Sequence, residues 1–464
     1  MYKNNINNID FNSLLVPYHE QFLTTLSSFV AIDSVYDEKT KSKENPFGIG
    51  VTTALKFIEK LAKKDGFKVK NYKNMIVEII FGSGEKNITI MAHADVVPPG
   101  DGWQSNPFSL KKDGDVIYGR GVSDDKGPLL AAYYALKALK ENKLLGDYQI
   151  RFLVGGNEES GSLGMKYYFD VLKKNEPTYG FSPDTDFPLI FAEKGLINFS
   201  IIKNIIIENV ISIEAGLAYN SVISRAKVKM KHDEKFIEFL SNNNVDYSLE
   251  ADNDYDYITF NGIPAHGATP EEGKNSGIIL LDSLANFYNN EELKNVVNKL
   301  TPLDGSGIDC ANNSIDMEHN SLNVGIISYQ NNELFIGVNF RHVDGVNVDE
   351  LKNKINNCID NAKININSTA DLLYYPKDCL LVRTLLDSYQ KETNDYKTNI
   401  LSIGGGTYAK ETKNVLAFGA QFLDFDTFMH SNKERAKLSS LYLAMRIYAR
   451  AILSLGDLID EAKI

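Results

Sequence analysis

Alternating helical and strand periodicities dominate the first part of the chain, from about Phe22 to Gly195. Three stretches repeat their apolar residues with the period of a helix, and two others are short apolar runs typical of strands. The predicted helices are Gly50–Lys64, Pro128–Glu141 and Gly164–Lys174, and the predicted strands are Asn87–Ala92 and Tyr148–Val154. Because strands that alternate with helices usually form one layered sheet, the pattern predicts an α/β domain.

The two predicted strands should lie in the middle of that sheet. Ile88–His93 and Gln149–Val154 are apolar with little polar alternation, which is typical of strands covered on both faces. In open α/β sheets, functional sites lie at the carboxyl ends of such strands. The residues that come after these two strands are therefore the first candidates for chemistry.

The sequence changes character twice along its 464 residues, a length that allows two or three domains of about 150 residues each. Between about 196 and 376 the chain is rich in Asn and Asp, with hairpin-like segments and helical stretches near Glu234–Leu240 and Gly277–Tyr288. This texture predicts an inserted α+β domain. From 377 the α/β texture returns, with helices near Cys379–Lys391 and Glu434–Leu455 and a strand at Val415–Phe418. The predicted domains are thus 196–376 and one discontinuous domain made of 1–195 and 377–464.

The charge balance argues against polyanionic partners. The chain carries 49 basic and 61 acidic residues, a net charge of −12. Because this charge repels phosphate backbones and anionic lipid surfaces at long range, we expect neither a nucleic-acid nor a membrane partner. No apolar run approaches the ~18 residues that span a bilayer, and the first residues lack the apolar core of a signal peptide. The expected location is the cytoplasm.

The first candidate site lies at the end of the strand that closes with Met91-Ala-His-Ala-Asp-Val-Val. His93 and Asp95 are two positions apart, so in an extended strand their side chains project to the same face. A neutral imidazole binds a divalent metal through one nitrogen, while a carboxylate can hold the other N–H and so set the ring direction. The pair is equally compatible with a structural hydrogen bond that binds no metal.

A glycine-bracketed loop delivers two further acids, Asp124 and Asp125, just before the helix that Pro128 can start. The alternative interpretation is an acidic helix N-terminus, which the helix dipole favours. After the second central strand, glycines on both sides flank Glu158 and Glu159. Neighbouring carboxylates repel each other unless a cation or a proton intervenes, although a solvated loop would also tolerate them.

Two further residues complete the candidate set. Asp184 comes directly after a loop proline, with Asp186 as the alternative, and His430 lies just ahead of the last helix. Two imidazoles with several carboxylates form a nitrogen and oxygen set that suits paired Zn²⁺ or Mn²⁺, and not copper or an iron–sulfur cluster. The chain has three cysteines and no CxxC pair, so we expect buried thiols and neither disulfides nor a thiolate metal site.

Seven motifs in a fixed order carry a family resemblance over nearly the whole chain. They are HADVV, YGRGVSDDKGP, NEESG, SPD, AHG, GGGTYA and MHSNKE. In this order they resemble the M20 metallopeptidase family, especially its PepV-like dipeptidases. The resemblance implies a zinc-peptidase-like α/β catalytic domain with a mixed sheet, a dinuclear metal centre and an inserted α+β lid domain.

By this resemblance, one metal ion has the ligands His93, Asp124 and Asp184, and the other has Asp124, Glu159 and His430. Asp124 would bridge the two ions, which would be Zn²⁺ or Mn²⁺. Asp95 would orient His93, and Glu158 would be the general base that moves a proton from water to the leaving amine. The family also implies a cis peptide bond between Asp124 and Asp125.

The resemblance further implies substrate-binding residues in and near the lid. His266 in the AHG motif would stabilise the oxyanion, and Arg341 would hold a terminal carboxylate through two hydrogen bonds. The remaining candidates are Asn220, Gly405, Gly406 and Thr407. Lys410 stands where dipeptidases of this group commonly have Arg, and it lacks the planar guanidinium group.

The leading hypothesis is therefore a two-metal hydrolase that cleaves dipeptides or short peptides with a free N-terminus. A lid that supplies His266 from the same chain implies a monomer. One alternative keeps the metals but changes the substrate, as in an N-acyl amino acid deacylase of the same family. Another is a metal- or peptide-binding protein without turnover, although such a protein would have no use for the base Glu158.

Overall fold

The computed structural model describes residues 6–461, which form two compact units. The first unit contains the chain up to Phe191, Tyr374–Leu401 and the chain from Gly406 onwards. The second unit contains Ala192–Leu373 and the short segment Ser402–Gly405. The domain boundaries at 195/196 and 376/377 stay predictions. Among residues 6–461, no helix has both the length and the apolar character required to cross a membrane.

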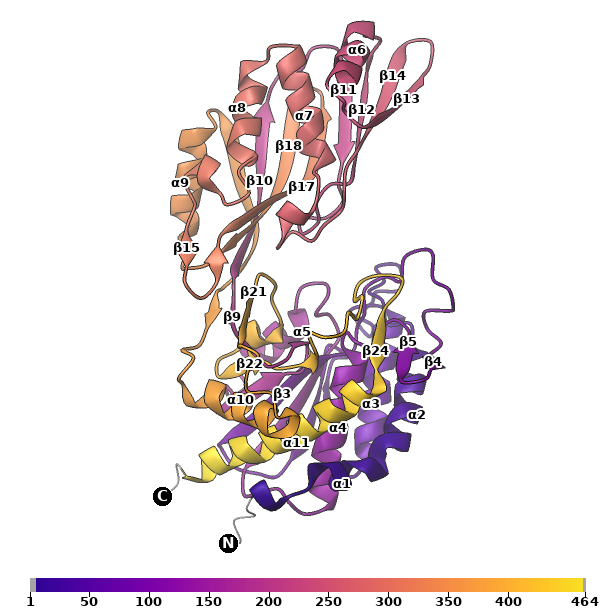
Figure 1. Cartoon of the computed structure of the whole chain (residues 1–464), viewed down its shortest axis with the longest axis vertical. Helices are drawn as coiled ribbons and strands as arrows, with labels where there is room; N and C mark the ends of the chain where they lie inside the picture. Colours follow the sequence, from indigo (N-terminus) through magenta and orange to yellow (C-terminus); the bar gives the residue numbers. More distant parts are fainter. Residues whose placement is uncertain (1–5, 462–464) are drawn as a thin grey trace. The chain divides into compact units, whose positions relative to one another are not determined.

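The first unit is built on a mixed nine-stranded sheet (Figure 1). Its main strand order is β1 (Lys68–Tyr72), β2 (Ile76–Phe81), β6 (Gln149–Gly155), β3 (Asn87–His93), β7 (Tyr179–Ser182), β22 (Val415–Ala417), β9 (Ile190–Glu193) and β20 (Leu373–Tyr374), with β21 (Leu401–Ile403) paired to β9. The central strand β3 runs parallel to β6 and β7, whereas β2 is antiparallel to β6. The predicted mixed sheet is therefore present.

Helices cover the central strands of this sheet. Strand β3 is buried along its whole length, and α4 (Lys126–Glu141) and α11 (Leu438–Glu461) pack against it and against each other. Helix α3 (Ile49–Lys64) packs on β1 and β2. The continuous apolar character of β3 thus reflects a strand with no solvent face, as predicted.

Two predicted helices of the first unit differ from the structure. The segment Gly164–Lys174, predicted as one helix, is a short helix α5 (Leu163–Lys166) with a π-helical turn after it at Tyr167–Val171. The last helix begins at Leu438 and not near Glu434. The reason is that β24 (Arg435–Lys437) is extended and pairs antiparallel with β5 (Val116–Tyr118).

The second unit is an eight-stranded antiparallel sheet with helices on one face (Figure 1). The strand order is β13 (Tyr247–Ala251), β14 (Tyr255–Asn261), β12 (Arg225–Lys231), β11 (Val210–Ala215), β17 (Ser321–Gln330), β18 (Glu333–His342), β10 (Gly195–Asn204) and β19 (Ala362–Ala370). The helices are α6 (Glu234–Asn242), α7 (Ser276–Phe287), α8 (Glu291–Leu300) and α9 (Val348–Cys358). The sequence predicts α6 and α7 but not α8 or α9. This unit has the α+β character expected of the insert.

Candidate metal centre

The carboxyl end of β3 forms the base of the site in the first unit. His93 is the last residue of this strand and lies beside Gly155, the last residue of β6. The His93 imidazole is fully buried, and the backbone N–H of His93 donates a hydrogen bond to the Asp125 carboxylate at 3.0 Å. The parallel pairing of β3 and β6 therefore brings the two sequence motifs at their carboxyl ends to one edge of the sheet.

Asp95 connects these two motifs. The Nδ1 atom of His93 lies 3.0 Å from the Asp95 carbonyl oxygen and 3.4 Å from its carboxylate. The same carboxylate accepts hydrogen bonds from the backbone N–H groups of Glu158 and Glu159, both at 3.1 Å. Because Nδ1 is engaged in this way, Nε2 is the nitrogen of His93 that faces the remaining candidates.

The Asp124 carboxylate lies between the two histidines. Its Oδ1 atom is 3.0 Å from Nε2 of His93, and its Oδ2 atom is 2.8 Å from Nε2 of His430. The Asp124–Asp125 peptide bond is cis, as the family resemblance implies. One carboxylate that turns a separate oxygen toward each of two imidazoles has the arrangement required to bridge two cations.

The other candidate ligands lie around the same point. Glu159 Oε1 is 3.2 Å from His430 Nε2, and Asp184 Oδ2 is 3.7 Å from His93 Nε2. Within residues 6–461, two groups have ligand-type atoms that all lie within 4.8 Å of one another. They are His93 with Glu158 and Asp184, and His93 with Asp124 and Glu159. The alternative candidate Asp186 lies in neither group.

The electrostatics of this cluster indicate a site that needs compensating positive charge. Burial and the nearby Asp124 raise the pKa of Glu159 to about 7. Burial and the charge of Asp184 raise the pKa of Glu158 well above its usual value. Contacts with Asp124 and Glu159 raise the pKa of His430 to about 11. Protons thus stabilise the packed carboxylates here, and divalent cations bound by the same nitrogen and oxygen atoms would replace those protons.

Comparison with known proteins identifies the family. The family model described as "Peptidase family M20/M25/M40" matches residues 89–454. The chain belongs to this family. A protein of Staphylococcus epidermidis (strain ATCC 12228 / FDA PCI 1200) named "Putative dipeptidase" is 32% identical over 465 residues, which cover 95% of this chain and 98% of the relative. The family expected from the motifs is confirmed.

Solved structures share the fold of this M20 peptidase. The dipeptidase Dug1p from Saccharomyces cerevisiae has a TM-score of 0.61 at 16% identity, with 96% of this chain and 98% of that chain covered. Human carnosine dipeptidase 1 has a TM-score of 0.60 at 14% identity, with the same 96% and 98% coverage. These similarities, at such identities, concern the fold, and they confirm the predicted mixed α/β class.

Two buried charged residues beside the site of this M20 peptidase were not predicted from the sequence. The side chain of Glu434 is buried and contacts the loop that carries Asp124. Lys126 is also buried, and its ammonium group donates hydrogen bonds to the carbonyls of Phe29 at 3.0 Å and Ile32 at 2.7 Å. Burial lowers the pKa of Lys126 to about 7. The only sequence signal for Glu434 was its place at the end of the MHSNKE motif.

The predicted lid residues lie in the second unit. Asn220 and His266 are neighbours, because Ser221 pairs with His266 in a β-bridge and the Asn220 carbonyl accepts a hydrogen bond from Gly267 N–H at 2.8 Å. Both Asn220 and His266 are exposed. The structure thus brings these two candidates together, although 46 positions separate them in the sequence.

Arg341 lies in β18 and is almost fully buried. Its Nε donates a hydrogen bond to Asn339 at 2.9 Å, and Nη1 donates one to the carbonyl of Gly404. Burial lowers the pKa of Arg341 to about 10. Arg341 therefore contacts the first glycine of the GGGTYA motif within the second unit.

The GGGTYA motif itself spans the boundary between the two units. Gly405 belongs to the second unit, whereas Gly406 and Thr407 belong to the first. The Thr407 hydroxyl accepts a hydrogen bond from the Ala409 N–H at 3.2 Å and so caps the short 3₁₀ helix that begins at the next residue. The substrate-binding roles of these residues stay predictions.

Proposed function

We propose that this M20 peptidase is a dinuclear metal-dependent dipeptidase. The observation that carries the proposal is the Asp124 carboxylate, whose two oxygens lie 3.0 Å from His93 and 2.8 Å from His430. The dipeptidase names of the Staphylococcus relative and of the structural neighbours support the substrate class. The substrate would be a dipeptide or short peptide with a free N-terminus.

The residues present fit two divalent cations. His93, Asp124 and Asp184 would hold one cation, and Asp124, Glu159 and His430 would hold the other. Imidazole and carboxylate ligands suit both Zn²⁺ and Mn²⁺, so metal availability decides between them. When bound, the cations would polarise the scissile carbonyl and lower the pKa of the attacking water.

Glu158 would act as the general base. Its backbone N–H is fixed by Asp95, and its carboxylate lies in the group with His93 and Asp184. Because neither proposed ligand set includes Glu158, it is available to accept a proton from the attacking water and to return it to the leaving amine. Glu159, in contact with His430, would remain a ligand.

Residues of the second unit, together with Gly406 and Thr407 of the first, would bind the substrate. His266 would donate a hydrogen bond to the oxyanion, and Arg341 would bind the terminal carboxylate. Asn220, Gly405, Gly406 and Thr407 complete the proposed substrate contacts. Since one chain carries all of these residues, the enzyme would work as a monomer. The cytoplasmic location also stays a prediction.

Elemental analysis combined with peptide turnover tests this proposal. Protein reconstituted with Zn²⁺ or Mn²⁺ should contain two cations and hydrolyse alanine-containing dipeptides. N-acetyl amino acids, assayed in parallel, should not be hydrolysed; turnover of these compounds alone would indicate a deacylase. Two bound cations without turnover of either substrate would favour a binding protein.

Replacement of the base separates its role from that of a ligand. Glu158→Gln should keep both cations, while kcat falls by ~10²- to 10⁴-fold because no carboxylate accepts the proton. Glu159→Gln is the matched control, since it removes a proposed ligand from the adjacent position and should lower the metal content. If Glu158→Gln loses metal instead, the roles of the two glutamates are exchanged.

A further inference from the structure

The carboxylate of Glu434 is fully buried and surrounded by hydrogen-bond donors. Its Oε1 atom accepts hydrogen bonds from the backbone N–H groups of Gly121 and Ser123 at 3.0 Å and of Asp124 at 3.3 Å. The Ser123 hydroxyl also donates to Oε1 at 3.0 Å, and Arg120 donates to Oε2 at 2.6 Å. One side chain therefore holds the backbone of the loop that carries Asp124.

Arg120 extends this network to the segment after β3. Its Nη2 atom donates hydrogen bonds to the carbonyls of Pro98 at 3.3 Å and Pro99 at 3.4 Å. These prolines come directly after the HADVV motif that contains His93. Arg120 thus connects the segment of His93 to the buried carboxylate of Glu434.

Glu434 belongs to the same short segment as His430. Immediately after it, β24 pairs with β5, and the Gly119 N–H donates a hydrogen bond to the Glu434 carbonyl at 3.3 Å. The chain before β24 carries His430, and the chain after β5 carries Asp124; the side chains of these two residues lie 2.8 Å apart. The Glu434 side chain also joins the two segments, across 310 positions of sequence.

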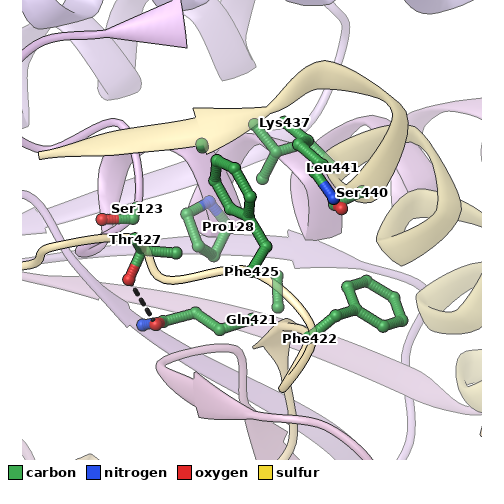
Figure 2. Close-up of a pocket in the computed structure, with 11 residues that line it drawn as sticks. Ser123, Pro128, Gln421, Phe422, Phe425, Thr427, Lys437, Ser440 and Leu441 are labelled. Carbon is green, nitrogen blue, oxygen red and sulfur yellow. Dashed lines mark hydrogen bonds between the residues drawn. The ribbon is translucent and has the colours of Figure 1, made fainter. Parts of the chain in front are cut away.

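A small cavity lies beside the loop that carries Asp124, whose residues are otherwise buried. A cavity of about 20 Å³ lies beside Ser123 and Pro128, with Phe425, Thr427 and Leu441 among its other lining residues (Figure 2). A space of this size accommodates about one water molecule. The hydrogen bonds to Glu434 therefore add a directional restraint on this loop beside its packing.

We propose that Arg120 and Glu434 are a positioning pair that sets the separation of Asp124 and His430 for two cations. The inference rests on the proposed function, because it concerns how the ligands of that function are held. A site that must satisfy two cations tolerates ligand displacements of only about 0.5 Å. In Glu434→Gln an NH₂ group replaces one carboxylate oxygen, so either the loop N–H groups or Arg120 lose their acceptor, and Arg120 keeps a buried charge without an ionic partner.

The experiment compares two chemically identical substitutions, Glu434→Gln and Glu392→Gln. Glu392 is the matched control because it is also a buried carboxylate, bound by Arg446 at 2.9 Å and Arg450 at 2.8 Å, in contacts that include no proposed metal ligand. Calorimetric titration of the metal-free proteins with Zn²⁺ and with Mn²⁺ gives the affinity of each cation. Thermal unfolding of the metal-free proteins measures any general loss of stability.

We expect Glu434→Gln to weaken the binding of the cation proposed for Asp124, Glu159 and His430, called here the second cation. Its affinity should fall by about 10- to 100-fold, as is typical when a group that orients metal ligands is replaced. At saturating metal, kcat should fall while KM changes little. Glu392→Gln should lower the melting temperature but keep the wild-type metal affinity. Wild-type affinity in Glu434→Gln, or an equal loss in Glu392→Gln, would overturn the positioning role.

A milder variant covers the case in which Glu434→Gln does not fold. Ser123→Ala removes one hydrogen-bond donor to Oε1 and should lower the affinity for the second cation several-fold. Unchanged affinity in this variant would overturn the proposal. The proposed function fails separately. Wild-type protein that binds two cations but hydrolyses no dipeptide would contradict the proposed dipeptidase function. The ratio of variant to wild-type metal affinity would still test the positioning role of Arg120 and Glu434. Wild-type protein that binds no cation would overturn both.

Discussion

The candidate metal centre of the first unit and the substrate-binding candidates of the second unit are built in different ways. In the first unit, buried carboxylates such as Asp95, Asp125 and Glu434 hold the backbone around the candidate ligands. In the second unit, Asn220 and His266 are exposed on neighbouring loops. The candidate metal ligands are thus preorganised within one unit, whereas two of the substrate-binding candidates lie on loops.

This difference leads to a functional separation that experiments can examine. Substitutions in the first unit should change metal content and kcat, because it contains the proposed metal ligands and the proposed general base. Substitutions in the second unit should change substrate affinity and leave metal content intact. The expected effects decrease from the bridging carboxylate of the first unit to a helix cap of the second.

Replacing the bridging carboxylate should have the largest effect. In Asp124→Asn, an amide would face either His93 or His430 with its NH₂ group, so at least one cation loses a ligand. The loss of several kcal/mol of charge stabilisation corresponds to a fall in kcat of roughly 10³-fold or more. Elemental analysis should find fewer than two cations per chain, with Asn220→Ala as the control that keeps both. Two cations and near-normal kcat in Asp124→Asn would contradict the bridging role.

The parts of this centre that the sequence predicts are those with a local signal. His93 and Asp95 end a continuously apolar strand, and Glu158 comes after another, so strand ends alone identify them as candidates. The family motifs add the assignment of metal ligands, including His430. Glu434 has no comparable signal, because its partners lie more than 300 positions earlier in the chain. Long-range pairing of this kind is visible only once the segments are folded together.

Substrate affinity should respond most to Arg341 in the second unit. If Arg341 binds the terminal carboxylate, Arg341→Ala should raise KM for free dipeptides by roughly 10- to 100-fold, the range of a hydrogen bond to a charged group. C-terminally amidated dipeptides, which lack that carboxylate, should show little change. Metal content should equal that of the wild type. Equal losses on both substrates would indicate a structural role, in which Arg341 acts through its contacts with Asn339 and Gly404.

The second unit also shows why some of the fold could not be predicted. Helices α8 and α9 contain several Asn and Lys residues, and the Asn-rich texture of the insert suggested turns instead of helices. In the structure, asparagines begin these helices: Asn290 caps α8, and Asn347 caps α9. An asparagine thus favours a turn or a helix start according to the residues after it. For α9, the burial of Leu351 and Ile355 favours the helix.

Substitution of one of these helix caps in the second unit should have the smallest effect. The Asn347 side chain accepts hydrogen bonds from the N–H groups of Asp349 at 2.9 Å and Glu350 at 3.1 Å. Asn347→Ala leaves both groups without this acceptor and should lower the free energy of unfolding by about 1 kcal/mol. Asn347→Asp, which keeps the acceptor, is the control and should restore stability. Because the proposed metal ligands all lie within the first unit, calorimetric titration should give the wild-type metal affinity for Asn347→Ala. A weakened metal affinity would show that the two units are energetically coupled and that the centre is not preorganised independently.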